Sequence, residues 1–298
     1  MRRSDAAGRS RRVRTPRRLV AVDLDGTLLD RQGKPHASDV AALRELRRRG
    51  VAVALATGRL YGGVLGAVRA IGLEGPVACA DGSHLVDAEN GRDLLHHGFE
   101  AGTLAGLRDR FAANTVTGFV LARDRVLHDA RGHAFLDYVG IWSERMHRHE
   151  AAITDHPHWH ADHVTALVGV GDQATITALH DTIVLEHGVN VQSVAFRVTL
   201  PVKVPGLEQP WSLLVRAPGP SKGTAVAWLA EHHGCTLDEV VVVGDWHNDV
   251  PMFKVAGRSF AMAQAPDDVK AVATDVLEAS HATGGGIAEA ARRAGLLP

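Results

Sequence analysis

Residues 19–30, LVAVDLDGTLLD, are the stretch of sequence that decides the fold. The first four residues form a short apolar run of the kind that makes a buried strand, and the carboxylates of Asp23 and Asp25 follow it at once. Two carboxylates at this spacing repel each other and resist burial. A compensating cation is therefore expected beside them, and a metal ion is the natural candidate.

The residues that follow predict a strand, a helix and a second strand. Residues 38–46 carry apolar side chains at helical spacing, with Ser38 as the expected N-cap and Gly50 as the expected stop. Residues 51–55 form another continuous apolar run, which predicts a buried strand. This strand–helix–strand order is typical of a parallel sheet.

The same order returns near the C-terminus. Ser221 is the expected cap of a helix over 222–230, and the apolar run 240–243 predicts a buried strand that leads into Gly-Asp-Trp-His-Asn-Asp at 244–249. A further strand is predicted at 259–262, followed by a helix over 266–273. Since parallel sheets bind ligands at the carboxyl ends of their strands, we expect five polar residues to converge there: Asp23, Asp25, Thr57, Asp245 and Asp249.

The middle of the chain has a different pattern of apolar residues. This pattern predicts an inserted α+β domain over 85–214. Strand-like runs at 164–170 and 191–200 alternate there with helical stretches at 103–111 and 175–187. The remaining segments, 19–84 and 215–298, are assigned to one α/β domain with a parallel sheet.

The first 18 residues contain eight Arg and one Asp, whereas the whole chain has a formal net charge of −1. We interpret them as a disordered Arg-rich tail, with a transit peptide or a nucleic-acid arm as the alternatives. The sequence has no apolar run of the roughly 20 residues that a membrane helix needs, and no apolar segment typical of a secretory signal. The expected location is cytoplasmic.

The residue types at the predicted sheet edge suit phosphate chemistry around a metal ion. Asp23 is the expected nucleophile and a metal ligand, and Asp25 is the expected general acid and base. Asp245 is expected to bind the metal directly and Asp249 through water, because hard oxygen ligands suit Mg²⁺. A polar surface turn is the alternative for each of these loops.

Four further residues are expected to hold a phosphate group. The hydroxyl of Thr57 and the backbone at Gly58 lie at a strand end, where they can bind phosphate oxygens. Lys222 stands at a predicted helix start, where a cation is unfavourable unless an anion accompanies it. Asn248 is expected to orient the phosphate or Lys222.

Taken in order, these motifs resemble the haloacid dehalogenase-like hydrolase superfamily, in its Cof-type branch. The segments that carry the resemblance are DLDGTLLD at 23–30, ATGR at 56–59, SKG at 221–223, GDWHNDVPM at 244–252, AMAQAP at 261–266 and GGGIA at 284–288. The match covers 19–84 and 218–292. The chain departs from the family's usual Asn-Gly at Asp81-Gly82, and from its usual Gly-Asn at Ala263-Gln264.

The resemblance implies a Rossmann-like core in which the insert 85–214 is a cap over the substrate. It also implies Mg²⁺, held by Asp23, Asp25, Asp245 and Asp249, and hydrolysis through an aspartyl phosphate. We therefore predict a Mg²⁺-dependent phosphatase acting on a small phosphorylated metabolite, either a sugar phosphate or a cofactor-like monoester. The alternatives are a phosphosugar mutase of the same fold and a non-catalytic protein that binds nucleic acid through its tail.

Six histidines between 147 and 163 are open to more than one interpretation. They are His147, His149, His156, His158, His160 and His163. A structural or solvated role is favoured over a metal site, because the segment lacks the acidic or cysteine partners of a typical zinc site. Substrate recognition by the cap is a third reading.

Overall fold

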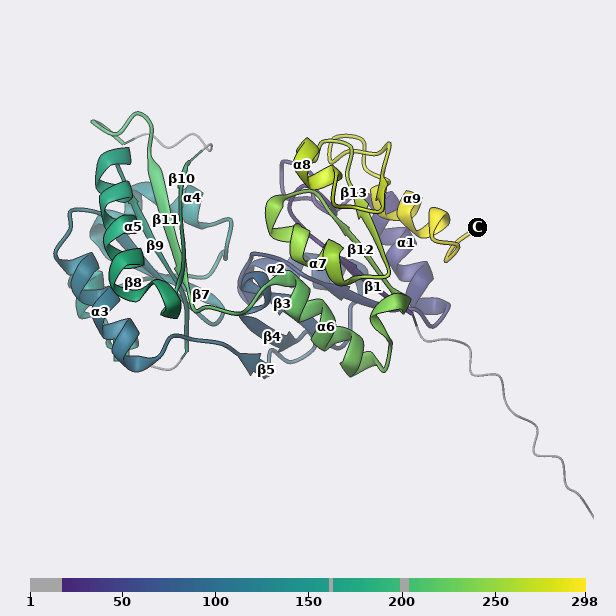
Figure 1. Ribbon diagram of the computed structural model, residues 1–298, viewed down its shortest axis with the longest axis horizontal. Coiled ribbons are helices and arrows are strands. Elements are labelled where there is room, and N and C mark those ends of the chain that lie inside the picture. Colours follow the sequence, from purple (N-terminus) through teal and green to yellow (C-terminus); the bar gives the residue numbers. More distant parts are fainter. Residues whose placement is uncertain (1–17, 161–162, 199–203) are drawn as a thin grey trace, which may run out of the picture.

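The computed structural model describes residues 18–160, 163–198 and 204–298, which form two bodies side by side (Figure 1). The α-helices are α1 Ala37–Arg48, α2 Tyr61–Ile71, α3 Ala101–Ala112, α4 Leu136–Val139, α5 Gln173–His187, α6 Lys222–His233, α7 Val250–Val255, α8 Asp267–Lys270 and α9 Gly286–Arg293. The strands are β1 Leu19–Val22, β2 Ala52–Leu55, β3 Pro76–Cys79, β4 His84–Asp87, β5 Asp93–His96, β6 Thr117–Ala122, β7 Arg125–His128, β8 Met146–Arg148, β9 Val164–Gly171, β10 Gln192–Arg197, β11 Trp211–Arg216, β12 Val240–Gly244, β13 Arg258–Ala261 and β14 Asp275–Val276.

The first body is built on a five-stranded parallel sheet with the order β14-β13-β12-β1-β2. Alternate residues of β1 point to opposite faces of this sheet. Val20 and Val22 pack in a cluster with residues of α1, α2 and α9, whereas Leu19 and Ala21 pack with residues of α6 and α7. A parallel sheet with helices on both faces confirms the predicted α/β class.

A three-stranded sheet extends this body. Strand β3 lies beside β2, where Ala56 and Ala78 form a parallel bridge, and it pairs with β4, which pairs with β5 in turn. Strands β4 and β5 lie almost wholly within the expected insert 85–214, yet they pair with β3 and not with the second body. This arrangement is not apparent from the sequence, because the hairpin carries no motif of its own.

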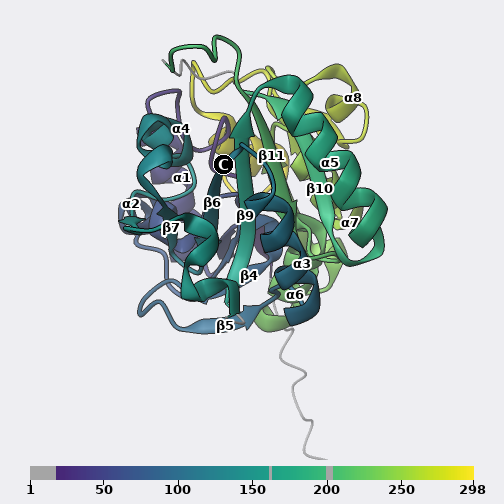
Figure 2. The ribbon, with the colours of Figure 1, turned by 90° about the vertical axis from the view of Figure 1, so that its left-hand side faces the viewer.

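The second body contains a six-stranded sheet with the order β10-β11-β9-β6-β7-β8, in which only β7 and β8 are parallel. Helices α3 and α5 cover its outer face (Figure 2). On the inner face, residues of β6 and α4 pack together with Leu60 and Ala80 of the first body. The inner face of this sheet is therefore turned toward the parallel sheet.

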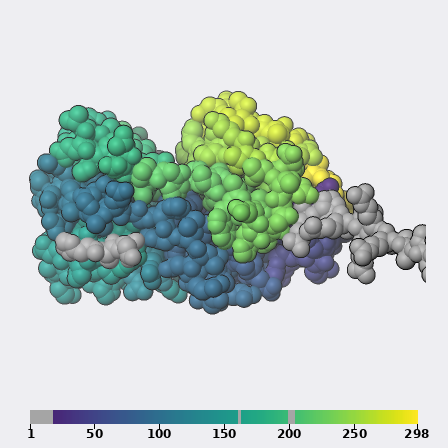
Figure 3. Space-filling model, turned by 60° about the horizontal axis from the view of Figure 1, so that its bottom comes forward, coloured from purple at the N-terminus to yellow at the C-terminus, as the bar shows by residue number. Residues whose placement is uncertain are grey.

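The chain passes between the two bodies twice, through 97–100 after β5 and through 217–221 after β11. In the space-filling view, a notch separates the upper parts of the bodies, and they touch below it through the blue and green segments (Figure 3). The division of the chain into a core and a cap stays a prediction. The tail, apart from Arg18, lies outside the described residues.

The two expected helix caps have different outcomes. Ser221 caps α6, because its side chain accepts from the backbone N–H of Thr224 at 3.2 Å. Ser38 is not an N-cap: α1 begins at Ala37, two residues earlier than a cap at Ser38 predicts, after His36, whose side chain makes no capping bond. Within the described residues, no helix is both long and apolar enough to span a membrane.

Candidate active site

The ends of three neighbouring strands bring the expected acidic residues together. Strand β1 lies between β2 and β12 in the sheet, so the loops that follow these three strands meet at one edge. Asp23 directly follows β1, and its backbone N–H donates to the carbonyl of Val243 in β12 at 3.0 Å. Asp23, Asp245 and Asp249 each offer an oxygen, and these three oxygens lie within 4.8 Å of one another. The predicted convergence is therefore present for these residues.

Two glycines make this close approach possible. Gly26 has a φ of +83°, and a Cβ on it would collide with the carboxylate of Asp245. Similarly, a Cβ on Gly244 would collide with the carboxylate of Asp249. Only glycine leaves room for the carboxylates at these positions, which explains why each motif pairs an Asp with a Gly.

Lys222 is the counter-ion of the cluster. Its side chain is fully buried, and its Nζ lies 2.6 Å from an oxygen of Asp23 and 2.6 Å from an oxygen of Asp249. The sequence predicts a phosphate as the partner of Lys222, but the structure pairs its ammonium with two carboxylates. One ammonium among three buried carboxylates leaves an excess of negative charge.

Asp249 also holds the loop that carries Asp245. Its second carboxylate oxygen accepts from the backbone N–H groups of Asp245 at 2.8 Å and of Trp246 at 3.0 Å. Because its other oxygen accepts from Lys222, both oxygens of this fully buried side chain are engaged. Asp249 therefore fixes the geometry of the loop.

The burial of this cluster changes the acidity of its members. Burial raises the pKa of Asp23, against the opposing effect of Lys222. Burial and the nearby Asp249 raise the pKa of Asp245 to about 7. Burial alone would lower the pKa of Lys222, but Asp23 and Asp249 outweigh it and raise that pKa. Each of these pKa shifts has the direction expected where buried carboxylates outnumber the positive charges beside them.

A divalent ion fits this donor set. The three buried carboxylates supply hard oxygen ligands, the kind that Mg²⁺ prefers, and the pKa values of two of them, Asp23 and Asp245, are raised. A second positive charge beside Lys222 would offset the remaining negative charge. Asp245 is already oriented, because Gln264 donates to its carboxylate at 3.1 Å and to the carbonyl of Gly26 at 2.7 Å.

Asp25 lies outside this group, although the sequence predicts it as a fourth metal ligand. Its carboxylate is half exposed and accepts two hydrogen bonds from the guanidinium of Arg59, at 2.8 and 2.5 Å. The structure therefore does not bring the side chain of Asp25 to the other three carboxylates. Asp25 and Arg59 form an ion pair, which the sequence does not indicate.

The expected phosphate-binding residues lie around the same edge. Gly58 and Asn248 line a cavity beside Asp23. Thr57 is fully buried, and its hydroxyl accepts from the backbone N–H of Arg59 at 3.1 Å, so it fixes the turn that presents Gly58.

Asp81 is a further residue of this edge that sequence reasoning missed. One of its carboxylate oxygens accepts from the side chain of Asn248 at 2.8 Å, and the other pairs with Arg216 of β11 at 2.5 Å. Asp81 lies in a turn where Ala80 and Asp81 both have positive φ, at 47° and 52°. The sequence does show that this chain has Asp81 where the family usually has Asn. That difference does not indicate which residues the side chain of Asp81 contacts.

The cavity beside Asp23 has a volume of about 220 Å³. Its lining residues are Asp23, Asp25, Gly58, Arg59, Ile141, Trp142, Asp245, Trp246 and Asn248. Ile141 and Trp142 belong to the second body, which therefore contributes one wall. These two residues and Trp246 were not predicted as site residues.

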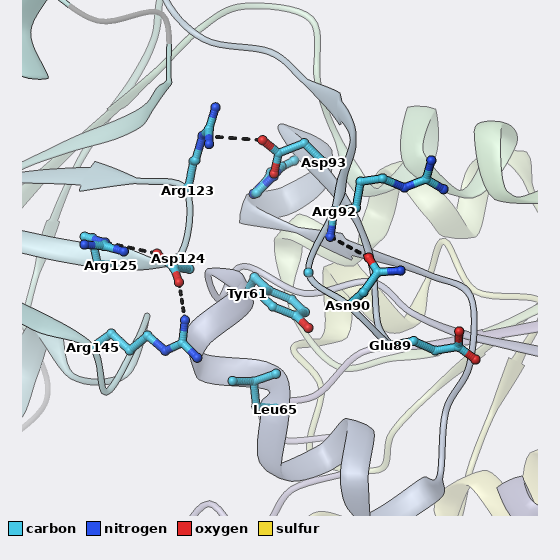
Figure 4. Close-up of a pocket in the computed structure, with 12 residues that line it drawn as sticks. Tyr61, Leu65, Glu89, Asn90, Arg92, Asp93, Arg123, Asp124, Arg125 and Arg145 are labelled. Atoms are coloured by element: carbon cyan, nitrogen blue, oxygen red, sulfur yellow. Dashed lines mark hydrogen bonds and ion pairs between the residues drawn. The ribbon is translucent and has the colours of Figure 1, made fainter.

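A larger cavity of about 540 Å³ lies at the junction of the two bodies, beside α2 and the β4–β5 loop (Figure 4). Four arginines line it, and three of them are paired there: Arg123 with Asp93, and both Arg125 and Arg145 with Asp124. None of the expected site residues lines this cavity. The candidate active site is therefore the smaller cavity.

The histidines of 147–163 form a chain of ring contacts. Ring centroids are 4.8 Å apart for His149 and His156, 4.5 Å for His156 and His158, and 4.4 Å for His158 and His163. In the described part of the chain, however, only Asp23, Asp245 and Asp249 bring three metal-ligand atoms together. The side chain of His160 lies outside the description.

Comparison with known proteins agrees with this geometry. A family model described as haloacid dehalogenase-like hydrolase matches residues 20–290. The chain belongs to this family. Among its relatives, pyridoxal phosphate phosphatase YbhA of Escherichia coli (strain K12) is 25% identical over 265 residues, which cover 87% of this chain and 93% of that protein. A phosphoglycolate phosphatase of Methanothermobacter thermautotrophicus is 27% identical, with 93% and 98% covered.

Comparison with solved structures gives the same result for the fold. A haloacid dehalogenase-like hydrolase from Bacteroides thetaiotaomicron superposes with a TM-score of 0.79 at 19% identity, covering 93% of this chain and 99% of that one. The predicted family and fold class are therefore confirmed. The family and its relatives also confirm that the chain is an enzyme, a phosphatase.

Proposed function

We propose that the protein is a Mg²⁺-dependent phosphatase that hydrolyses a small phosphorylated metabolite, a sugar phosphate or a cofactor-like monoester, through an aspartyl phosphate on Asp23. The observation that carries this proposal is the buried group of Asp23, Asp245 and Asp249 around Lys222, open to a cavity on one side. The names of the relatives support a small substrate, since they specify pyridoxal phosphate and phosphoglycolate.

Asp23 and Asp245 would hold the ion directly, because Asp249 is already engaged by Lys222 and two backbone N–H groups. Bound there, Mg²⁺ would supply charge stabilisation for the phosphoryl oxygens. Lys222 favours the ionised form of Asp23 and holds its carboxylate in a fixed orientation, as a nucleophile requires.

In the first step, a carboxylate oxygen of Asp23 attacks phosphorus, and the bond from phosphorus to the substrate oxygen breaks. Asp25, in its acid form, gives its proton to the departing oxygen and becomes a carboxylate. In the second step, Asp25 takes a proton from water, which attacks phosphorus and releases inorganic phosphate and Asp23. Arg59 binds the carboxylate form of Asp25, so this ion pair must open for Asp25 to carry a proton.

The phosphate group would lie against Gly58 and Asn248, which line the cavity next to Asp23. Thr57 supports this binding by fixing the turn at Gly58, and Lys222 supplies positive charge behind Asp23. Such preorganised donors stabilise the charge of the transferring group without reorganisation.

Phosphate release from p-nitrophenyl phosphate tests the proposal. We expect release that requires Mg²⁺ and is abolished by EDTA, and Asp23→Asn should lower it by at least about a thousandfold, because the amide is no nucleophile. Asp267→Asn, which changes a fully exposed carboxylate that does not line the cavity, is the matched control and should keep wild-type rates.

Two results would contradict the proposal. If turnover does not depend on a divalent ion, the acidic group does not act as a metal site. If Asp23→Asn keeps ordinary turnover, Asp23 is not the nucleophile. If the protein interconverts sugar phosphate isomers and releases little phosphate, it is a mutase of the same fold.

A further inference from the structure

Three of the residues that line the cavity carry large apolar side chains, Trp246, Ile141 and Trp142. The rest of the lining is Arg59, Gly58, Asn248 and the acidic residues. A monoester whose phosphate lies against Asp23, Gly58 and Asn248 leaves the three apolar side chains and Arg59 to contact its leaving group.

Two of the side chains expose an unusual amount of apolar surface. Trp246 is 56% exposed and Ile141 is 38% exposed, although both are large and border a cavity that is otherwise highly charged. Exposed large apolar groups at a cavity mark a binding surface more often than a packing defect. They lie on opposite bodies, Trp246 after β12 and Ile141 after α4, so the cavity has one apolar wall from each.

The aromatic rings are held in place. The backbone N–H of Trp246 donates to Asp249, and its ring meets that of His247 edge to face, with centroids 5.1 Å apart. The ring of Trp142 meets that of Tyr138 at 5.3 Å and 72°. Rings fixed in this way form a preorganised surface for a flat partner.

These four side chains offer few partners to a hydroxylated leaving group. Trp246 and Trp142 can each donate one N–H and Ile141 none, and Arg59 already donates to Asp25 and to the carbonyl of Gly63. Sites that select polyols supply hydrogen-bond partners for each hydroxyl, because an unpaired buried hydroxyl is costly. The same engagement of Arg59 leaves no ready partner for a carboxylate.

We propose that the preferred substrate is the phosphate monoester of a planar aromatic alcohol, whose ring stacks on Trp246 and packs against Ile141 and Trp142. This inference rests on the proposed function, and it narrows the substrate class of that same site. Trp246 and Ile141 are its specificity-determining residues.

Kinetics with three substrates test this assignment: pyridoxal 5′-phosphate as the planar aromatic, glucose 6-phosphate as the polyol and 2-phosphoglycolate as the small acid. We expect the wild type to have a kcat/KM for pyridoxal 5′-phosphate at least about tenfold above the other two. Trp246→Ala should lower that value about tenfold, mainly through KM, which is the size of one stacked ring contact. It should leave the other two substrates within about twofold.

Three further variants complete the test. Trp246→Phe keeps a flat ring and should retain most of the preference for pyridoxal 5′-phosphate. If the indole had only a structural role, the Phe variant would not retain activity selectively toward this one substrate. Ile141→Ser should also lower the aromatic preference. Leu185→Ser, which alters an apolar side chain 86% exposed on α5, should change nothing.

The outcomes separate the two proposals. If the wild type hydrolyses none of the substrates with Mg²⁺, nor p-nitrophenyl phosphate, the proposed function fails. If it hydrolyses glucose 6-phosphate or 2-phosphoglycolate as well as the aromatic ester, or if Trp246→Ala slows all three equally, the phosphatase stands and the aromatic subsite is wrong.

Discussion

Lys222 shows how a single side chain sets the charge of this site. Its ammonium is completely removed from solvent and contacts the carboxylates of two loops that lie far apart in the sequence. A buried ion pair contributes little net stability compared with an apolar replacement of both partners, but removing one partner alone is expensive. Asp23 and Asp249 therefore both depend on the positive charge of Lys222.

Replacing Lys222 with Met should harm both stability and catalysis. Two buried carboxylates would lose their counter-ion, so we expect the free energy of unfolding without Mg²⁺ to fall by about 3–5 kcal/mol. In the presence of Mg²⁺, kcat should fall by at least about a hundredfold. Urea titrations and phosphate release measure the two effects. Lys254→Met, at an exposed lysine of α7, is the control; near-wild-type values for Lys222→Met would refute the assigned role.

Among the turns and loops, the turn Ala80–Gly82 connects the active site to the second body. Backbone N–H groups of Ala80 and Asp81 donate to the carbonyls of Arg59 and Thr57, both at 2.8 Å. The side chain of Asp81 then joins Asn248 to Arg216, the last residue of β11. The departure from the family's usual Asn thus has a physical reason, because an Asn cannot form an ion pair with Arg216.

Asp81→Asn should weaken substrate binding while it leaves the fold intact. The amide oxygen can still accept from Asn248, but the ion pair with Arg216 is lost, so we expect kcat/KM to fall about threefold to tenfold. Arg216→Met should have a similar effect. Because the two residues share one interaction, the double variant should lose little more than either single one. Additive losses in this double-mutant cycle would show that the two side chains act separately.

Sequence alone predicts the parallel sheet and the meeting of Asp23, Asp245 and Asp249, because short apolar strands and their polar ends define that edge. It does not predict the Asp25–Arg59 pair or the wall formed by Ile141 and Trp142. The pair joins side chains from two loops of the first body, and the wall depends on how the second body packs against the first; no local pattern of sequence encodes either contact.

At the scale of the whole molecule, the β4–β5 hairpin forms part of the junction. His84 is buried and hydrogen-bonds Asp93 at 2.8 Å, and Asp93 pairs with Arg123 of the second body. His96, whose ring meets that of His84 at 5.2 Å, hydrogen-bonds Thr165 of β9 at 3.0 Å. Both histidines therefore contribute to the contact between the two bodies.

These histidines should make stability depend on pH. Burial, and secondarily the neighbouring His84, lower the pKa of His96 from 6.5 to about 4, while Asp93 opposes this and Arg123 and His163 add to it. A lowered pKa means that the unfolded chain binds more protons between these values, so the stability is present above pH 6.5 and is lost as the pH falls toward 4.

We expect urea midpoints to fall between pH 7 and pH 4.5, and His96→Gln to reduce this loss by about 1 kcal/mol after allowance for partial exposure. His133→Gln, in the segment between β7 and α4, is a control that should follow the wild type. An unchanged pH slope in the His96 variant would contradict the assignment.

The two crossings of the chain between the bodies, at 97–100 and 217–221, set the freedom of the whole enzyme. Two tethers restrict the movement of one body relative to the other more than a single tether does, and they favour rotation about the line that joins them. Such a rotation would change the distance of Ile141 and Trp142 from Trp246, and a pair of spectroscopic labels placed on either side of the cavity would follow it.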